Sequence, residues 1–192
     1  MKLSLLEAEK PKTICAIDAS TTSLAFAIFV NDELYKFGKI RFNGKTTYQK
    51  VGDAARKTKL LFDEFQIDAI IIEQTIYANS PKTAAALALS QGAMLGAARM
   101  AGVKLFGSTS PMVWQNYIGN KRLTTAEKQK IAESNPGKSK SWLKQQERNI
   151  RKSRTVRFVN VQYDLQVGDD DIADAIAIGH WAINNWDKAF NY

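Results

Sequence analysis

The hydrophobic pattern of the first half of the chain predicts three strands, a helix and a fourth strand. Residues 13–18 and 23–30 are almost continuously apolar, and 34–42 alternates apolar with polar residues. Short polar turns separate these three runs, which indicates antiparallel neighbours. Across 46–65 the apolar residues recur at helical spacing, as in an amphipathic helix that covers a sheet. The apolar run at 69–73 is typical of a central strand that is covered on both faces.

The second half predicts helices around one further strand. A Ser-Pro pair begins a helix at 80–100, and a second Ser-Pro pair begins another after 110. The segment 103–107 is a plausible fifth strand, and a capping box at 124 starts the next helix. A last helix is expected at 168–186. This order predicts an α/β fold with a mixed sheet flanked by helices, whose functional groups lie at strand ends.

The length of 192 residues fits one domain, 1–192. No run reaches the roughly 18 apolar residues that cross a bilayer, and the first ten residues contain Glu7 and Glu9, where a signal peptide would be apolar. We therefore expect a soluble intracellular protein without a membrane partner. The single cysteine, Cys15, lies in an apolar strand and is expected to be a small core residue.

Basic residues are concentrated in one block of the chain. The net charge is +8, but 121–157 alone holds twelve Lys or Arg against three Glu, so the remainder is close to neutral. Such a block predicts a polyanionic partner, although a solvated basic helix without a ligand would have the same composition. The candidate contacts to such a polyanion are Lys121, Arg122, Lys138, Lys140, Lys144, Arg148, Arg151, Lys152 and Arg154.

Four acidic residues are expected to converge. Asp18 ends the first strand and Glu73 ends the central one, while Asp171 and Asp174 are three residues apart and share a face of the last helix. Clustered carboxylates repel one another unless cations neutralise them. Hard oxygen ligands indicate magnesium or manganese rather than zinc, and two such ions could activate water for phosphodiester hydrolysis.

Each acid also has a simpler explanation. Asp18 could cap the turn that follows its strand, and the acids at 169–171 could complement the helix dipole. Asp174 lies beyond the first turn among apolar residues, so the dipole explains it less well. Glu73 ends an apolar strand, where a carboxylate needs a partner or a metal.

These segments resemble the RuvC-type Holliday junction resolvases of the RNase H-like nuclease superfamily, in a layout similar to phage and viral members. The matching segments are AIDASTTSLAFAIF around Asp18, AIIIEQTIYANSPKTAAALALSQGAMLGAARMAGV around Glu73, TTAEKQKI around Lys128 and DIADAIAIGHWAI around Asp171 and Asp174. The resemblance implies an RNase H-like fold, with a mixed five-stranded sheet of three antiparallel strands followed by two parallel ones.

The resemblance also implies a crossover junction endodeoxyribonuclease. Such an enzyme is a homodimer that nicks a four-way DNA junction symmetrically, with two Mg²⁺ ions per active site for which Mn²⁺ can substitute. The four acids would take the metal-binding positions, and Lys128 would lie near the scissile phosphate. Ile76 and Tyr77 would meet bases at the crossover, although Tyr77 could equally be a surface-packing residue. The helix at 80–100 would form the dimer interface or, alternatively, pack only within its own subunit.

The chain departs from the family pattern at three places. Ala19-Ser20 replaces the usual Pro-Gly, Trp114 lies where a lysine is common, and the basic segment within 121–157 is an insertion relative to the bacterial enzymes. Other functions stay open. These are an RNase H-like nuclease for flaps or RNA–DNA hybrids, and a noncatalytic junction-binding protein. An actin-like sugar kinase would need a second lobe and glycine-rich nucleotide loops that the sequence lacks.

Overall fold

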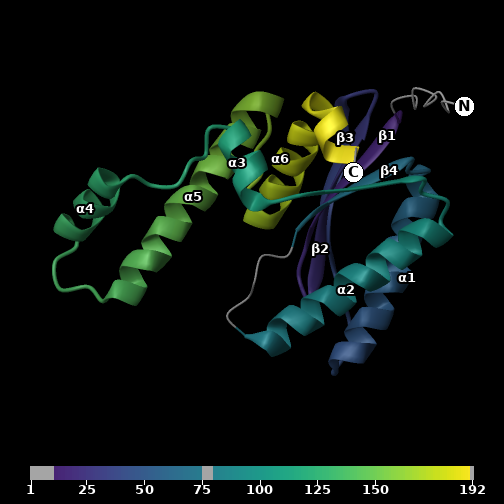
Figure 1. Ribbon diagram of the computed structural model, residues 1–192, viewed down its shortest axis with the longest axis horizontal. Coiled ribbons are helices and arrows are strands. Elements are labelled where there is room, and N and C mark those ends of the chain that lie inside the picture. Colours follow the sequence, from purple (N-terminus) through teal and green to yellow (C-terminus); the bar gives the residue numbers. More distant parts are fainter. Residues whose placement is uncertain (1–10, 75–79, 191–192) are drawn as a thin grey trace, which may run out of the picture.

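The computed structural model describes residues 11–74 and 80–190 (Figure 1). Within these ranges no helix combines the length and apolar character that crossing a membrane requires. The strands are β1 (Thr13–Ala19), β2 (Ser23–Val30), β3 (Glu33–Arg41), β4 (Ala69–Glu73) and β5 (Leu105–Thr109). The helices are α1 (Thr47–Phe65), α2 (Pro81–Met100), α3 (Pro111–Tyr117), α4 (Thr125–Glu133), α5 (Lys140–Tyr163), α6 (Asp170–Asn184) and α7 (Trp186–Phe190).

The five strands form one sheet in the order β3-β2-β1-β4-β5. The β1–β2 and β2–β3 pairs are antiparallel, and the β1–β4 and β4–β5 pairs are parallel. The β2–β3 hairpin turns at Asn31 and Asp32, whose φ angles of 50° and 69° are those of the tight turns that suit twisted hairpins. The predicted α/β class and the mixed five-stranded sheet are confirmed.

Both faces of the sheet are covered, so its apolar strands have a core on each side. One core lies between the sheet and helices α1 and α2, and the other lies between the sheet and α6 (Figure 1). Helix α6 packs so closely that a Cβ at Gly179 would lie 2.1 Å from the ring of Phe29. Cys15 is buried in the first core, as predicted, and burial raises the pKa of its thiol.

Several boundaries differ from the prediction. The last helix, expected at 168–186, runs from Asp170 to Asn184, and the separate helix α7 follows it. The fifth strand, expected at 103–107, begins at Leu105 because the backbone N–H groups of Lys104 and Leu105 both donate to the Asp68 carbonyl, where pairing with β4 begins. Helix α5 continues to Tyr163, beyond the predicted basic segment, and ends where Asp164 adopts a left-handed conformation. Helix α4 and the first half of α5 project away from the sheet (Figure 1).

Candidate active site

One row of residues crosses the sheet where β1 and β4 end. Strand pairing places Lys39 of β3 beside Ala25 of β2, and Ala25 beside Asp18 of β1. The parallel β1–β4 register ends one residue before Asp18 and Glu73, and Glu73 lies beside Thr109 of β5. Because side chains alternate between faces, Asp18 and Glu73 both extend toward the α6 side of the sheet. Two predicted metal ligands are therefore neighbours on adjacent strands.

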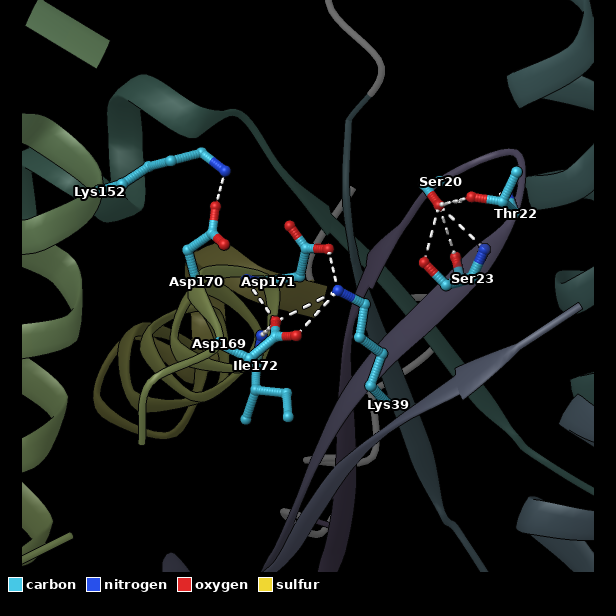
Figure 2. Close-up of polar contacts among 9 residues, drawn as sticks. All are labelled: Ser20, Thr22, Ser23, Lys39, Lys152, Asp169, Asp170, Asp171 and Ile172. Carbon is cyan, nitrogen blue, oxygen red and sulfur yellow. Dashed lines mark hydrogen bonds and ion pairs between the residues drawn. The ribbon is translucent and has the colours of Figure 1, made fainter. Parts of the chain in front are cut away.

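The first turn of α6 brings three more acids to this row. Asp169 is the N-cap residue, and its side chain accepts hydrogen bonds from the backbone N–H groups of Asp171 and Ile172. The Lys39 ammonium lies 3.0 Å from an Asp169 carboxylate oxygen and 2.6 Å from one of Asp171 (Figure 2). Asp169 therefore caps α6, and Lys39 connects β3 to α6.

The four predicted acids share one electrostatic field. Burial raises the pKa of Asp18 well above its usual value, and the negative charges of Glu73, Asp174 and Asp171 raise it further. Burial, followed by the charge of Glu73, raises the pKa of Asp174 to about 7, although the nearby Lys152 ammonium opposes this. Effects of this kind require carboxylates that lie close together in a poorly hydrated place.

Ser20 stabilises the turn after β1. Its hydroxyl oxygen accepts hydrogen bonds from the backbone N–H groups of Thr22 and Ser23 at 3.2 and 2.9 Å (Figure 2). The hydroxyl thus performs the turn-capping role that was the alternative explanation for Asp18. Asp18 instead lies in the row with Glu73.

The donor set fits a hard divalent cation. All four predicted ligands are carboxylates. Burial raises the pKa of Asp18, Glu73 and Asp174, and neighbouring negative charge, which a cation would neutralise, raises the pKa of Asp18 and Asp174 further. Within the described residues, the acids that can place their oxygens within 4.8 Å of one another are Asp169, Asp170 and Asp171. Of the predicted set, this trio contains only Asp171, which is paired with Lys39.

Trp114 of α3 contacts Glu73 directly. Its ring is fully buried, and its indole Nε1 donates a hydrogen bond to Glu73 Oε1 at 2.8 Å. Burial raises the pKa of Glu73, and this hydrogen bond lowers it. The position at which the sequence departs from the family pattern therefore contacts the proposed catalytic centre.

A groove of about 380 Å³ lies between the acids and α5. Glu73 and Asp174 line one part of it. Its predicted basic residues are Lys144, Arg148, Arg151 and Lys152. Lys144, Arg148 and Lys152 are four residues apart, so they follow one face of α5 toward the acids. Lys152 also forms an ion pair with Asp170 (Figure 2).

The remaining predicted basic residues lie elsewhere. Lys128 of α4 is paired with Glu147 at 2.9 Å, and Arg154 is paired with Glu127 at 2.6 Å, so both side chains connect α4 with α5. Lys138 lies over the Trp142 ring. Lys121, Arg122 and Lys140 are exposed. Ile76 and Tyr77 lie outside the described residues.

The prediction missed Lys39 and the role of Trp114. Lys39 lies in the alternating strand at 34–42, and alignment of the three antiparallel strands would have placed it level with Asp18. Trp114 contacts a residue 41 positions away in the sequence, and no local sequence pattern predicts such a contact.

No protein-family model and no curated protein matches the chain in sequence. Among solved structures, Thermus thermophilus RuvC in complex with a Holliday junction substrate aligns with a TM-score of 0.66 and 16% identity, over 93% of this chain and 98% of that one. Another Thermus thermophilus RuvC structure aligns with a TM-score of 0.64 at the same identity and coverage. A yeast mitochondrial Holliday junction resolvase aligns with a TM-score of 0.50 and 13% identity, over 87% of this chain and 75% of that one. This chain therefore has the RNase H-like fold of the RuvC structures.

Proposed function

We propose that this protein is a Holliday junction resolvase, a structure-selective endonuclease that nicks branched DNA by metal-dependent phosphodiester hydrolysis. One observation carries the proposal. Asp18, Glu73, Asp171 and Asp174 share a field at one end of an RNase H-like sheet, beside a groove that basic residues of α5 line. The solved structures with this fold include one bound to a Holliday junction.

The proposed mechanism divides the work between two sets of residues. The four acids would hold two Mg²⁺ ions, or Mn²⁺ in their place, which would supply activation of water and stabilisation of the leaving oxygen. The strands fix Asp18 and Glu73, while α6 presents Asp171 and Asp174. Basic residues of α5 that line the groove hold the phosphate backbone beside the acids.

Lys128 has a narrower role in this proposal than its sequence match suggests. Its ammonium is paired with Glu147, and Glu147 lines the same groove as Glu73. We propose that Lys128 contributes at the edge of the groove. Lys152, whose charge acts on both Asp18 and Asp174, and Arg151, on which the charge of Asp174 acts, are basic residues of α5 that lie near the acids.

We also propose a homodimer in which α2 contacts a second copy. One side of α2 packs into its own core through Met94 and Ala98, but Leu89 and Met100 remain exposed. An apolar groove between α1 and α2 includes the exposed Leu60. A dimer suits a four-way junction because two active sites can cut two strands symmetrically. Light scattering measures the mass in solution, and a monomeric mass would contradict this part of the proposal.

We propose that 1–192 acts as one nuclease domain whose basic helical extension, about 121–157, contacts DNA. The cell compartment would be one that holds branched DNA, namely the cytoplasm of a bacterium or of an infected host cell.

The decisive experiment compares substrates. Four-way junction, flap, RNA–DNA hybrid and linear duplex are incubated with the protein in Mg²⁺ and, separately, in Ca²⁺. We expect symmetric nicks in the junction with Mg²⁺, and binding without cutting when Asp18→Asn or Glu73→Gln is present. Preferred cutting of flaps or hybrids would assign a different RNase H-like nuclease. Full cleavage by both variants would refute the metal site, and binding without any cutting would indicate a noncatalytic junction-binding protein.

A further inference from the structure

We infer that Trp114 is a positioning residue, which fixes the Glu73 carboxylate so that it can bind the divalent cation of the proposed nuclease. The inference rests on the proposed function. The observation behind it is the 2.8 Å hydrogen bond from the buried indole of α3 to Glu73 Oε1 at the end of β4.

Glu73 needs such a partner because it is the last residue of its strand. The backbone there is fixed, since the Gln91 side-chain amide donates to the Glu73 carbonyl at 3.1 Å and Gln74 N–H donates to the Thr109 carbonyl at 2.8 Å. The carboxylate, however, is separated from that backbone by several rotatable bonds. A donor on a fully buried ring has little freedom of its own, so the bond at Oε1 restricts the orientation of the carboxylate beside the groove that Glu73 lines.

The chemistry of the donor matters as much as its position. An indole N–H is a donor without charge, whereas an ammonium would neutralise the carboxylate and compete with a metal ion. The Trp114 bond favours the charged form of Glu73, against the effect of burial, and leaves the negative charge in place. Trp114 thus holds a ligand without weakening the attraction of the site for a divalent cation.

Helix α3 also connects Glu73 to the basic helix. The residue after Trp114 is Gln115, whose side-chain oxygen accepts a hydrogen bond from Arg151 of α5. Asn120, just beyond α3, donates to the Arg151 carbonyl at 2.8 Å. Helix α3, which orients Glu73, is therefore hydrogen-bonded to α5, which lines the groove that would hold DNA. These bonds fix the position of Glu73 relative to the groove.

The test compares two substitutions that remove the same atoms from the same core. Trp114→Phe removes the indole N–H beside Glu73. Trp181→Phe is the matched control, because Trp181 is also buried in the α6-side core and lies two helical turns beyond Asp174. For both proteins, the melting temperature, the affinity for Mn²⁺ alone by calorimetry, and junction affinity in EDTA are measured.

We expect both variants to melt at similarly reduced temperatures and to bind the junction as the unmodified protein does. Only Trp114→Phe should bind Mn²⁺ about 10- to 100-fold more weakly, as loss of a partner that orients a metal ligand does. Its cleavage rate should recover in part at high Mg²⁺, because the defect is in binding the ion. If Trp114→Phe fails to fold, replacement of Trp114 by its benzothienyl analogue, with sulfur in place of the N–H, preserves the shape and gives the same expectation.

Unchanged Mn²⁺ affinity in Trp114→Phe or in the benzothienyl protein would overturn the inference. An equal loss of affinity in Trp181→Phe would overturn it as well, since the effect would then come from general loosening of the core. Neither result touches the proposed function, provided that the unmodified protein binds Mn²⁺ and cuts the junction. If the unmodified protein does neither, the proposed function fails and this inference with it.

Discussion

Asp18 and Glu73 extend from adjacent strands of a sheet with a core on both faces, whereas Lys144 and Arg148 extend from a helix that projects beyond that sheet (Figure 1). The strands hold the two acids to a fixed separation, which metal binding requires. The helix presents its charges to solvent, which suits contact with a flexible polyanion. In the proposed nuclease, catalysis would therefore depend on the sheet and DNA affinity on α5, and mutations should affect the two separately.

The largest expected effect comes from the acidic side of this comparison. Asp174→Asn should reduce junction cleavage at saturating Mg²⁺ by about a thousandfold or more, corresponding to about 4 kcal/mol of transition-state stabilisation. Junction binding should stay the same or strengthen, because one negative charge is removed beside the groove. Single-turnover cleavage and a binding titration measure the two effects.

Asp170→Asn is the control for that substitution, since Asp170 lies on the same helix but is paired with Lys152. It should retain cleavage within about tenfold of the unmodified protein. If both substitutions reduced the cleavage rate equally, the α6 acids would act as a general negative charge rather than as defined metal ligands.

The next largest effect is a loss of junction affinity when basic residues of α5 are replaced. Replacing Lys144 and Arg148 together by Gln should lower junction affinity by about 10- to 100-fold near 0.1 M salt. It should also reduce the slope of log affinity against log salt by about 1.8, if each residue contacts one phosphate. The cleavage rate of the saturated complex should be unchanged. Lys104→Gln with Lys188→Gln removes the same charge from exposed sites outside the groove, and an equal loss there would show that only net charge matters.

Much of the acidic side was predictable from the sequence because strands and helices constrain it locally. A carboxylate at the end of an apolar strand, as at Glu73, indicates both the position and the unusual environment of the residue. Asp171 and Asp174 share a face in any helix. The adjacency of Asp18 and Glu73 required only that the two strands be neighbours, and the sheet order confirms this.

The role of the basic residues was less predictable, because the charge of a side chain does not tell where in the fold it points. The sequence predicted that nine basic residues contact DNA. In the structure Lys144 and Arg148 line the groove, whereas Arg154 is paired with Glu127. Which side chains pair with acids depends on how α4 packs against α5, a long-range arrangement that periodicity does not encode. Trp114 and Lys39 escaped prediction for the same reason, since their partners are far away in the sequence.

Lys39 allows a smaller test within the acidic centre. Its ammonium forms ion pairs with the carboxylates of Asp169 and Asp171 (Figure 2). It therefore competes with a metal ion for Asp171, as a monovalent cation would. Lys39→Met should therefore lower the Mg²⁺ concentration for half-maximal cleavage by about three- to tenfold, because Asp171 is released to the metal. A higher Mg²⁺ requirement would instead mean that Lys39 holds Asp171 in its binding position. Lys36→Met, on the same strand, is the control.

The smallest expected effect concerns stability without metal. The pKa of Asp174 is raised to about 7, so the folded state keeps a proton that the unfolded chain loses near pH 4. Between these values the folded state binds more protons, and stability must fall as pH rises. Asp174→Asn removes this loss, so in EDTA the variant should melt about 5 °C above the unmodified protein at pH 8 and close to it at pH 5.

Comparing the two proteins also removes the contribution of His180. Burial lowers the pKa of that imidazole, so the unfolded chain takes up its proton more readily and stability from this group rises with pH. His180 contributes equally to both proteins, and the difference between their melting temperatures reports Asp174 together with the effect of its charge on Asp18. Saturating Mg²⁺ should reverse the ranking at pH 8, because the ion stabilises only the protein that has all four carboxylates. A difference in melting temperature that is constant from pH 5 to 8 would mean that Asp174 titrates normally, and would contradict a buried Asp174 carboxylate beside Glu73.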